Sequence, residues 1–332
     1  MAHDTQAVDV VCIGNAIVDV LSHADDAFLE EHGMVKGTMR LIDAESAHAL
    51  YAAMGPAVES SGGSAANTAA GIASFGGRAA FIGKVANDLL GEVFTHDIRA
   101  TGVLFDPREL PDDGATGRCF VLVTPDAQRT MNTFLGVSSY LSPRDVDEEL
   151  VAAAQVVYCE GYLWDEPVAK QALRKGMDVA RDAGKKVAFT LSDPFCVDRH
   201  RDEFLELAEH RVDILFANEP EICALYATEA WEEAARRVSE HCEIACLTRS
   251  EKGSVIVSAA GDHIEIPAFP VDEVIDTTGA GDLYAAGFLY GYTAGRGLEA
   301  AGRLGALAAS EVISHLGARP ERRLAELAEV IE

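Results

Sequence analysis

The feature of this sequence that most limits its fold is a repeated alternation of short apolar runs with stretches of helical spacing. Apolar runs of this length are typical of buried strands, and a helix after each strand is typical of βαβ units. Such units build a mostly parallel sheet that helices cover on both faces. The predicted strands are Val8–Ile13, Ala79–Ile82, Gln155–Cys159, Val187–Leu191, Val212–Ala217 and Ile244–Leu247, and the predicted helices are Ala65–Phe75, Asp88–Ala100, Pro167–Ala183 and Asp202–His210.

Two pairs of segments depart from this alternation and have the pattern of antiparallel strands. The first pair is Ile17–Leu21 with Thr38–Ile42, and the second is Arg118–Thr124 with Arg129–Leu135. The second pair turns at Thr124-Pro125-Asp126-Ala127, where a type I turn accepts proline. The chain shows no internal repeat and no linker, so we predict one domain over residues 1–332 with a small β lid formed by about residues 16–43 and 114–136.

Acidic residues outnumber basic ones, since 54 Asp and Glu against 27 Lys and Arg give a net charge of −27. A surface of this sign repels nucleic acid and anionic lipid, so we expect neither as a partner. No apolar run of about 18 residues is present, which argues against a membrane span. Small molecules are the expected partners, and the sequence leaves open whether the protein is a monomer or a homodimer.

The seven cysteines form no C-x-x-C pair, and Asp4 stands where a signal peptide needs basic residues. Both observations favour a reducing, cytoplasmic location. Cys242 and Cys246 beside His241 raise the alternative of a metal site, but no second ligand pair follows at zinc-like spacing. We therefore interpret the cysteines as small buried thiols.

The sharpest local motif is Asp276-Thr277-Thr278-Gly279-Ala280-Gly281-Asp282, which leads directly into a helical pattern. Backbone amides in the first turn of a helix lack intrahelical partners and carry partial positive charge, so they attract anions. Glycine at 279 and 281 lets an anion approach those amides, and the Asp282 carboxylate follows at once. The motif predicts a catalytic anion-binding site, and a plain helix start is the alternative.

A second glycine turn, Ser61-Gly62-Gly63-Ser64, leads into another helix, on which Asn67 lies about one turn further on. An amide side chain donates and accepts hydrogen bonds at once, which suits a sugar hydroxyl. Asp19 stands in an otherwise apolar strand, and one carboxylate accepts two hydrogen bonds from vicinal hydroxyls. The alternatives are a helix N-cap at Ser64 and a solvent-facing Asp19. A binding site requires Asp19, Gly63 and Asn67 to converge.

Other phosphate and nucleophile motifs do not occur. In a P-loop around Gly83-Lys84 the first glycine would fall at Arg78 and the Ser or Thr at Val85. The sequence also has no Gly-x-Gly-x-x-Gly after a strand and no Gly-x-Ser-x-Gly. A P-loop enzyme, a dinucleotide-binding fold and an α/β-hydrolase are therefore not expected.

The two glycine motifs resemble the two signatures of the ribokinase-type (PfkB) sugar and nucleoside kinases. The first signature is matched by Gly62-Gly63, Asn67, Gly76-Gly77, Gly83-Lys84-Val85, Asp88 and Gly91, and the second by Asp276–Asp282. Within this family the chain is most similar to adenosine kinases, on the evidence of Gly14–Val20, Leu191–Phe195 and Val212–Glu221. The resemblance implies an α/β/α sandwich with a β lid. It also implies transfer of the ATP γ-phosphoryl group to the 5′-hydroxyl of adenosine.

The resemblance implies roles for single residues as well. Asp282 is the expected base, and Gly279, Ala280 and Gly281 supply backbone amides as an anion hole. Arg129 is expected to meet the phosphates when the lid closes, and a solvated hairpin arginine is the alternative. The residues implied to hold the substrate are Asn15, Asp19, Gly63, Ser64 and Asn67. Those implied to line the base, although such residues are also typical of a core, are Met39, Phe120, Met131, Leu135 and Tyr162.

For the nucleotide, the implied ligands are Asn218, Glu221, Thr248 and Gly253, together with Gly279 and Gly281. Asn218 and Glu221 would organise Mg²⁺ and its waters, because magnesium prefers to keep several waters. Asp276 and Thr278 match a monovalent cation site, so K⁺ is a further expected ion. A ribose or fructose kinase, an inosine or guanosine kinase and a non-catalytic nucleoside-binding protein are the alternatives that the sequence leaves open.

Overall fold

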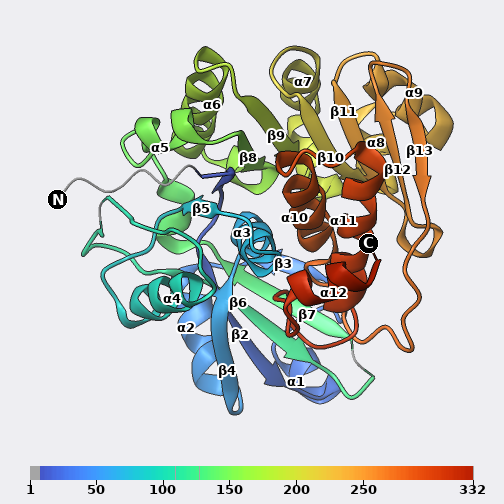
Figure 1. The fold of residues 1–332 in the computed structure, drawn as a ribbon. Coiled ribbons are helices and arrows are strands. Elements are labelled where there is room, and N and C mark those ends of the chain that lie inside the picture. Colours follow the sequence, from blue (N-terminus) through green and yellow to red (C-terminus); the bar gives the residue numbers. More distant parts are fainter. Residues whose placement is uncertain (1–7, 109, 127, 332) are drawn as a thin grey trace.

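The computed structural model describes residues 8–108, 110–126 and 128–331 (Figure 1). Its larger sheet has the strand order β13-β12-β11-β10-β9-β8-β1-β5. The strands from β11 to β5 are parallel, and β12 and β13 add an antiparallel edge. The predicted, mostly parallel sheet is thus confirmed. Its strands are β1 (Val10–Ile13), β5 (Ala79–Ile82), β8 (Val156–Glu160), β9 (Lys186–Thr190), β10 (Ile214–Asn218), β11 (Ile244–Thr248), β12 (Ser254–Ser258) and β13 (His263–Ile266).

Helices cover both faces of this sheet, because successive side chains of a strand point to opposite sides. In β1, Val10 and Cys12 belong to one apolar cluster, whereas Val11 and Ile13 belong to another. The first cluster includes α3 (Ser64–Ser74), α4 (Leu89–Ala100), α10 (Ala280–Thr293), α11 (Leu298–Val312) and α12 (Leu324–Ile331); the second includes α5 (Glu148–Ala153), α6 (Pro167–Asp182), α7 (Pro194–His210), α8 (Glu219–Leu225) and α9 (Trp231–Ser239). The expected three-layer α/β/α arrangement is confirmed.

A smaller sheet lies below the larger one in Figure 1, in the order β3-β7-β6-β2-β4. Its strands are β2 (Ile17–His23), β3 (Met39–Leu41), β4 (Ala57–Gly62), β6 (Gly117–Val123) and β7 (Arg129–Phe134). Two helices, α1 (Asp26–Glu31) and α2 (Ala44–Ala53), pack on one face through Leu29 and Leu50. We call these strands and two helices the small-sheet unit.

The predicted pairing of the first hairpin in this unit is wrong. β2 pairs antiparallel with β4 and parallel with β6, while β3 pairs parallel with β7. We did not predict β4, because Glu59-Ser60-Ser61 lacks the apolar alternation of a strand. The second hairpin is confirmed, since β6 and β7 pair antiparallel. Ala127 of its predicted turn lies outside the described residues.

One helix is longer than expected. α7 begins at Pro194 rather than at Asp202, with a non-helical backbone at His200 that marks a kink. The Asp193 side chain caps its start by accepting a hydrogen bond from the Cys196 amide. Among the described residues no helix is both long and apolar enough to cross a bilayer.

Candidate active site

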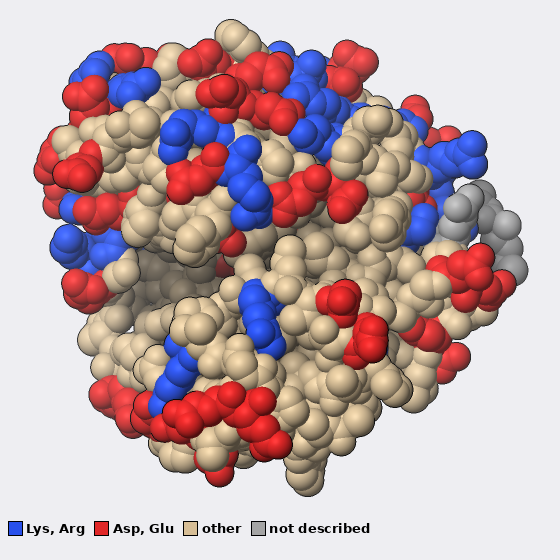
Figure 2. All heavy atoms as spheres, turned by 180° about the vertical axis from the view of Figure 1, so that it is seen from behind, with Lys and Arg blue, Asp and Glu red and all other residues tan. Residues whose placement is uncertain are grey.

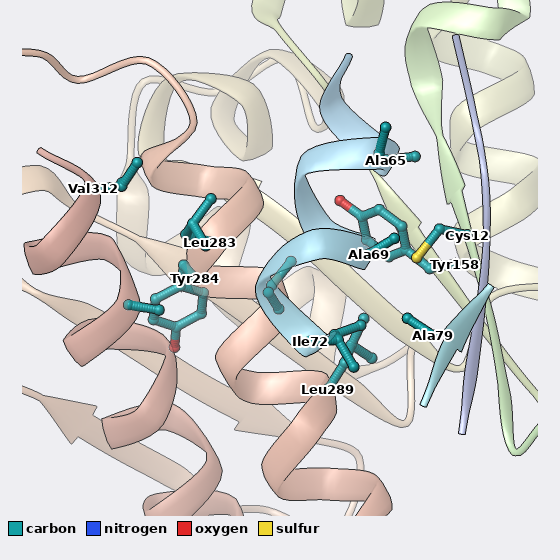
Figure 3. Packing of buried hydrophobic residues seen from close by; sticks show 14 of the residues in the cluster. Cys12, Ala65, Ala69, Ile72, Ala79, Tyr158, Leu283, Tyr284, Leu289 and Val312 are labelled. Atoms are coloured by element: carbon teal, nitrogen blue, oxygen red, sulfur yellow. The ribbon is translucent and has the colours of Figure 1, made fainter. Parts of the chain in front are cut away.

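The two glycine motifs meet because they begin two helices, α3 and α10, that pack against each other. Figure 3 shows Ala69 and Ile72 of α3 close to Leu283 and Leu289 of α10. The contact is tight, since a Cβ on Gly71 of α3 would lie 2.6 Å from the Cβ of Ala286 on α10. This packing brings the first turns of both helices, with their polar residues, into one place.

Asp282, in the first turn of α10, is bound directly by α3. Its two carboxylate oxygens accept hydrogen bonds from Ser64 Oγ at 2.6 Å and from Asn67 Nδ2 at 2.9 Å. Burial raises the pKa of Asp282, whereas these two bonds and the charge of Arg319 lower it. A carboxylate whose pKa is raised in this way is suited to accept a proton. The alternative of a helix N-cap at Ser64 is wrong, because Gly63 occupies the cap position.

Asn67 and Asp19 offer acceptor atoms to a ligand. The Asn67 Oδ1 atom is buried and has no hydrogen-bond partner among the described residues. Burial is the main cause that raises the pKa of Asp19 to about 7, and nearby Asp282 raises it further, while Arg319 and Arg129 lower it. Within the described part of the chain no side chain or amide donates to the Asp19 carboxylate. Both groups therefore remain available to hydroxyl groups.

The glycines beside them have a packing role. A Cβ on Gly62 would overlap the Asp19 carboxylate, and one on Gly63, whose φ is +96°, would overlap the carbonyl oxygen of Asn15. Glycine is thus required at both positions so that β2 and the start of α3 approach closely. The two glycines place Asp19 next to α3.

Asn15 faces the protein interior rather than an open site. Its backbone amide and its Nδ2 atom both donate to Glu160 Oε1 at 2.7 Å, and its Oδ1 atom accepts from Ser138 Oγ at 3.0 Å. Glu160 Oε2 accepts from the Ala65 amide at 2.8 Å, so this carboxylate ties β8 to the start of α3. Asn15 therefore supports the site in this structure, and its contact with a substrate stays a prediction. Sequence reasoning missed Glu160, because an acid at a strand end has no distinctive local pattern.

Replacing Glu160 with glutamine should destabilise the fold by about 1–3 kcal/mol. Burial raises the pKa of Glu160 to about 7, and three donated hydrogen bonds from Asn15 and Ala65 oppose this rise. Glutamine has one acceptor oxygen, so its NH₂ group would face a donor. Urea unfolding measures the change, with Glu265→Gln as the control, because that side chain is 81% exposed. Equal unfolding midpoints for the two variants would contradict this role.

The start of α10 provides amides, but not all three of those predicted. The Ala280 amide donates to the Thr277 carbonyl at 3.2 Å. Gly279 has a φ of +78° and packs against Ala318, which explains why glycine is required there. In the described structure the amides of Gly281 and Asp282 have no protein acceptor, and a Cβ on Gly281 would meet nothing within 4 Å. The Gly279 amide likewise has no acceptor among the described residues, so an anion is best placed at the amides of Gly279, Gly281 and Asp282 rather than at that of Ala280.

Arg129 of β7 reaches this motif from the small-sheet unit. Its guanidinium forms an ion pair with Asp276 and donates to Thr278 Oγ1 at 2.8 Å. Only 9% of the side chain is exposed, and its Nε and Nη2 atoms are buried without a partner in the described residues. The solvated-hairpin alternative is therefore wrong. Two donors of this arginine are free for an anion beside α10.

The same contacts bear on the predicted monovalent cation site. Asp276 also accepts hydrogen bonds from the amides of Thr278 and Gly317, at 2.9 and 2.8 Å. Its carboxylate is thus engaged by Arg129 and by two amides in this structure. The described residues hold no group of three or more His, Cys, Asp or Glu side chains arranged for a metal ion. A K⁺ ion at Asp276 and Thr278 stays a prediction.

The predicted base-lining residues divide between the two faces of the smaller sheet. Phe120 is fully buried on the face that α2 covers, with its ring 6.1 Å from that of Tyr51, so its predicted position in the cleft is wrong. Its neighbours on β6, Cys119 and Val121, point to the other face. Asp19 is paired with Cys119 and shares that face. The predicted residues Met39, Met131 and Leu135 also lie there.

Two aromatic residues lie just beyond the carboxyl ends of β8 and β9. Tyr162, in the short helix η2 (Gly161–Asp165), donates its hydroxyl to the Ser192 carbonyl at 3.2 Å. Ser192 has a left-handed backbone with φ of 73°, and the Phe195 ring that follows is 76% exposed. Phe195 was missed because only the structure shows that this aromatic ring is left uncovered.

The predicted magnesium residues form a helix cap. The Asn218 side chain accepts from the Glu221 amide, and the Glu221 carboxylate accepts from the Asn218 amide and Nδ2 at 2.9 and 2.7 Å. Glu221 is 5% exposed, and burial raises its pKa to about 7. This capping box accounts for the motif structurally. Each Glu221 oxygen retains a lone pair, so a contact to a metal-bound water remains feasible.

The residues predicted beside ATP lie at the end of β11 and in the turn after it. Thr248 ends β11, and Ser250 begins the short helix η3 (Ser250–Lys252) with φ of 52°. Serine therefore adopts the left-handed backbone for which glycine is usual. Gly253 has φ of +83°, and a Cβ there would overlap the Ile266 carbonyl. Ser250 and Gly253 therefore both contribute a positive φ to the turn after β11.

Seen from behind, the surface is hollowed between the part that carries the larger sheet and the small-sheet unit (Figure 2). Acidic side chains gather along the outer edge of the small-sheet unit in this view. The negative surface predicted from the sequence is therefore visible beside the hollow, and any anion bound near α10 relies on local amides and arginines.

Comparison with known proteins places these observations in context. The model of the pfkB family of carbohydrate kinases matches residues 38–323. The crystal structure of adenosine kinase from Sinorhizobium meliloti is 53% identical, with a TM-score of 0.92, covering 98% of this chain and 100% of that one. Adenosine kinase of Saccharomyces cerevisiae is 27% identical over 93% of this chain and 95% of its own length. The ATP-dependent ribose-1-phosphate kinase of Halopiger xanaduensis is 32% identical over 76% of this chain and 81% of its own length.

Proposed function

The chain belongs to the pfkB family of carbohydrate kinases, and from this premise we propose that it transfers the γ-phosphoryl group of ATP to the 5′-hydroxyl of adenosine, giving AMP and ADP. Membership of the family implies ATP as phosphate donor and usually Mg²⁺. The observation that carries the proposal is the position of Asp282. It lies at a helix start with free amides and is bound by Ser64 and Asn67 of the other motif.

In the proposed reaction Asp282 accepts the proton of the 5′-hydroxyl. The hydroxyl oxygen forms a bond to the γ-phosphorus, and the bond from that phosphorus to the β–γ bridging oxygen breaks, leaving ADP. The ribose is held by Asp19 and by Asn67 Oδ1, which accept hydrogen bonds from its other hydroxyls. The free amides of Gly281 and Asp282 and the free donors of Arg129 face the charge that spreads over the transferred group.

Magnesium would supply positive charge at the phosphate oxygens. The residues that fit it are Glu221 and Asn218, but only through water, because the Glu221 carboxylate already caps α8. Glu221 and Asp282 interact electrostatically, since Asp282 raises the pKa of Glu221. The cap therefore positions a carboxylate near the site without exposing it.

A purine, rather than a free sugar, is supported by the apolar surroundings. Met131, Cys119 and Val121 line the open face of the smaller sheet. The exposed Phe195 ring offers a further surface on which a base stacks. A free sugar has no use for these surfaces. The ribose subsite of Asp19 and Asn67 would also serve a sugar kinase, which the ribose-1-phosphate kinase relative keeps as the second candidate.

Adenosine should be phosphorylated with a kcat/KM about 5- to 150-fold above that for ribose or fructose, because stacking of the base adds about 1–3 kcal/mol beyond the ribose contacts. Adenosine, inosine, guanosine, ribose and fructose are assayed in parallel for ADP release. In a matched pair, Phe195→Ala should raise the KM for adenosine about 10-fold, whereas the exposed control Leu104→Ala should not. A preference for a free sugar would refute the adenosine assignment and leave the kinase.

A further inference from the structure

Arg319 lies in the loop between α11 and α12 and reaches across to the start of α3. Its guanidinium donates to the Ser61 carbonyl at 3.2 Å, to Ser61 Oγ at 3.1 Å and to the Ala66 carbonyl at 2.9 Å. All three acceptors are neutral. Within the described ranges no carboxylate forms an ion pair with this arginine, and the carboxylate that acts on it most strongly is Asp97, which accepts a hydrogen bond from the Ser61 amide at 2.7 Å.

These contacts place the guanidinium behind the two acids of the site. Gly62, which follows Ser61, packs on the Asp19 carboxylate. Asn67, which follows Ala66, donates to Asp282. The charge of Arg319 accordingly lowers the pKa of Asp19 and that of Asp282, against the burial that raises both. Burial lowers the pKa of Arg319 to about 10, and the negative charges of Asp97, Asp19 and Asp282, in that order, oppose this change.

Arg319 is the positively charged group that lowers the pKa of Asp282. Arg129 is already paired with Asp276. The other titratable groups that interact with Asp282 are all acids. The carboxylates Asp19 on β2, Glu160 on β8 and Glu221 on α8 oppose a further negative charge when they are ionised. Tyr158 and Tyr162 stay neutral, because burial raises their pKa well above the usual value. Two acids buried together resist simultaneous ionisation unless a cation is near.

We propose that Arg319 is a positioning residue whose charge keeps Asp282 and Asp19 ionised together, so that a base and an acceptor for hydroxyls coexist in one buried site. The inference rests on the proposed function, because it takes Asp282 as the base. Arg319 acts through these acids and through Ser61 and Ala66, not by touching a substrate.

The test is the pH dependence of kcat/KM, measured with whichever acceptor the wild-type protein phosphorylates best. For Arg319→Gln the acid limb should move to higher pH by about 1 unit, because the acids lose an opposite charge, and activity should recover in alkaline buffer. Arg319→Lys keeps the charge, so its limb should stay near that of the wild type. Arg237→Gln is the control, since Arg237 also donates to a backbone carbonyl, that of Tyr226, but lies on α9.

A rate lowered by the same factor at every pH in Arg319→Gln would overturn the proposal, because a purely structural loss has no pH signature. An acid limb that moves as far in Arg319→Lys would also overturn it. If a melting curve shows Arg319→Gln to be unfolded, Arg319→Lys alone decides, and an unshifted limb is the expected result. Failure of the adenosine assignment is seen separately, as a wild-type preference for another acceptor.

Discussion

Asp282→Asn should lower kcat by at least about 100-fold, with a modest change in KM, because general base catalysis contributes two to four orders of magnitude. Asparagine has nearly the same shape and cannot take the hydroxyl proton. The new asparagine can accept from Asn67 Nδ2 through its own oxygen and donate its NH₂ group to Ser64 Oγ, because a hydroxyl both donates and accepts, so Asn67 keeps its orientation. The ribose contacts are therefore expected to survive, and the loss should fall on the chemical step.

Steady-state kinetics of ADP release measure this loss, and nucleoside binding by calorimetry checks that the site is intact. Asp213→Asn is the matched control: Asp213 accepts a hydrogen bond from the Val187 amide at 2.8 Å, near the amino end of β10, away from the motifs. In the wild type, kcat should fall as the pH is lowered through the raised pKa of Asp282, since only the ionised carboxylate accepts a proton. An unchanged kcat in Asp282→Asn would remove the base from the mechanism.

Arg129→Ala should lower kcat by about 100-fold, the usual effect of removing one preorganised donor from a transferred group. The free Nε and Nη2 atoms of Arg129 are the donors that would be lost. Nucleoside affinity should change little, because Asp19 and Asn67 remain. The buried Asp276 carboxylate loses its ion-pair partner in this variant, so Arg129→Lys is measured beside it and should retain part of the rate.

Arg40→Ala separates this effect from a general loosening of the small-sheet unit. Arg40 lies on β3 and donates to Asn132 Oδ1 at 2.5 Å and to the Gly33 carbonyl at 3.1 Å. In the register of β3 and β7 its neighbour Met39, not Arg40, shares the face of Arg129. Near-wild-type turnover is expected for Arg40→Ala. Turnover as low as in Arg129→Ala would show that the unit, not the arginine, was damaged.

The larger sheet and the two motifs could be predicted because their signals are local. Each buried strand is a short apolar run, and each motif combines glycines with the start of a helix. The pairing of β2 could not be predicted, because its partner β4 is polar and α1, β3 and α2 lie between the two strands in the sequence. The pairing of β6 with β7 across a short turn could be predicted. A strand pattern alone does not say which element lies beside it.

Single residues were missed or misplaced for the same reason. Phe120 and Cys119 are adjacent on β6, and only the place of α2 decides which of them faces the cleft. The sequence predicts that Asn15 binds substrate, but in the structure its polar atoms form hydrogen bonds with Glu160 and Ser138. Arg319 belongs to no sequence motif. Its proposed role follows from the position of its loop, from which its guanidinium donates to the Ala66 carbonyl of α3.

The contacts that build the site span most of the chain, and this affects when activity can arise during synthesis. Ser64 and Asp282 are 218 residues apart, and Arg319 lies 258 residues beyond Ser61. Closing such long loops costs entropy that only late tertiary contacts offset. A ribosome-bound fragment that ends before residue 319 lacks the guanidinium that donates to the Ser61 and Ala66 carbonyls. The nascent protein can therefore fold much of its sheet well before it becomes a competent kinase.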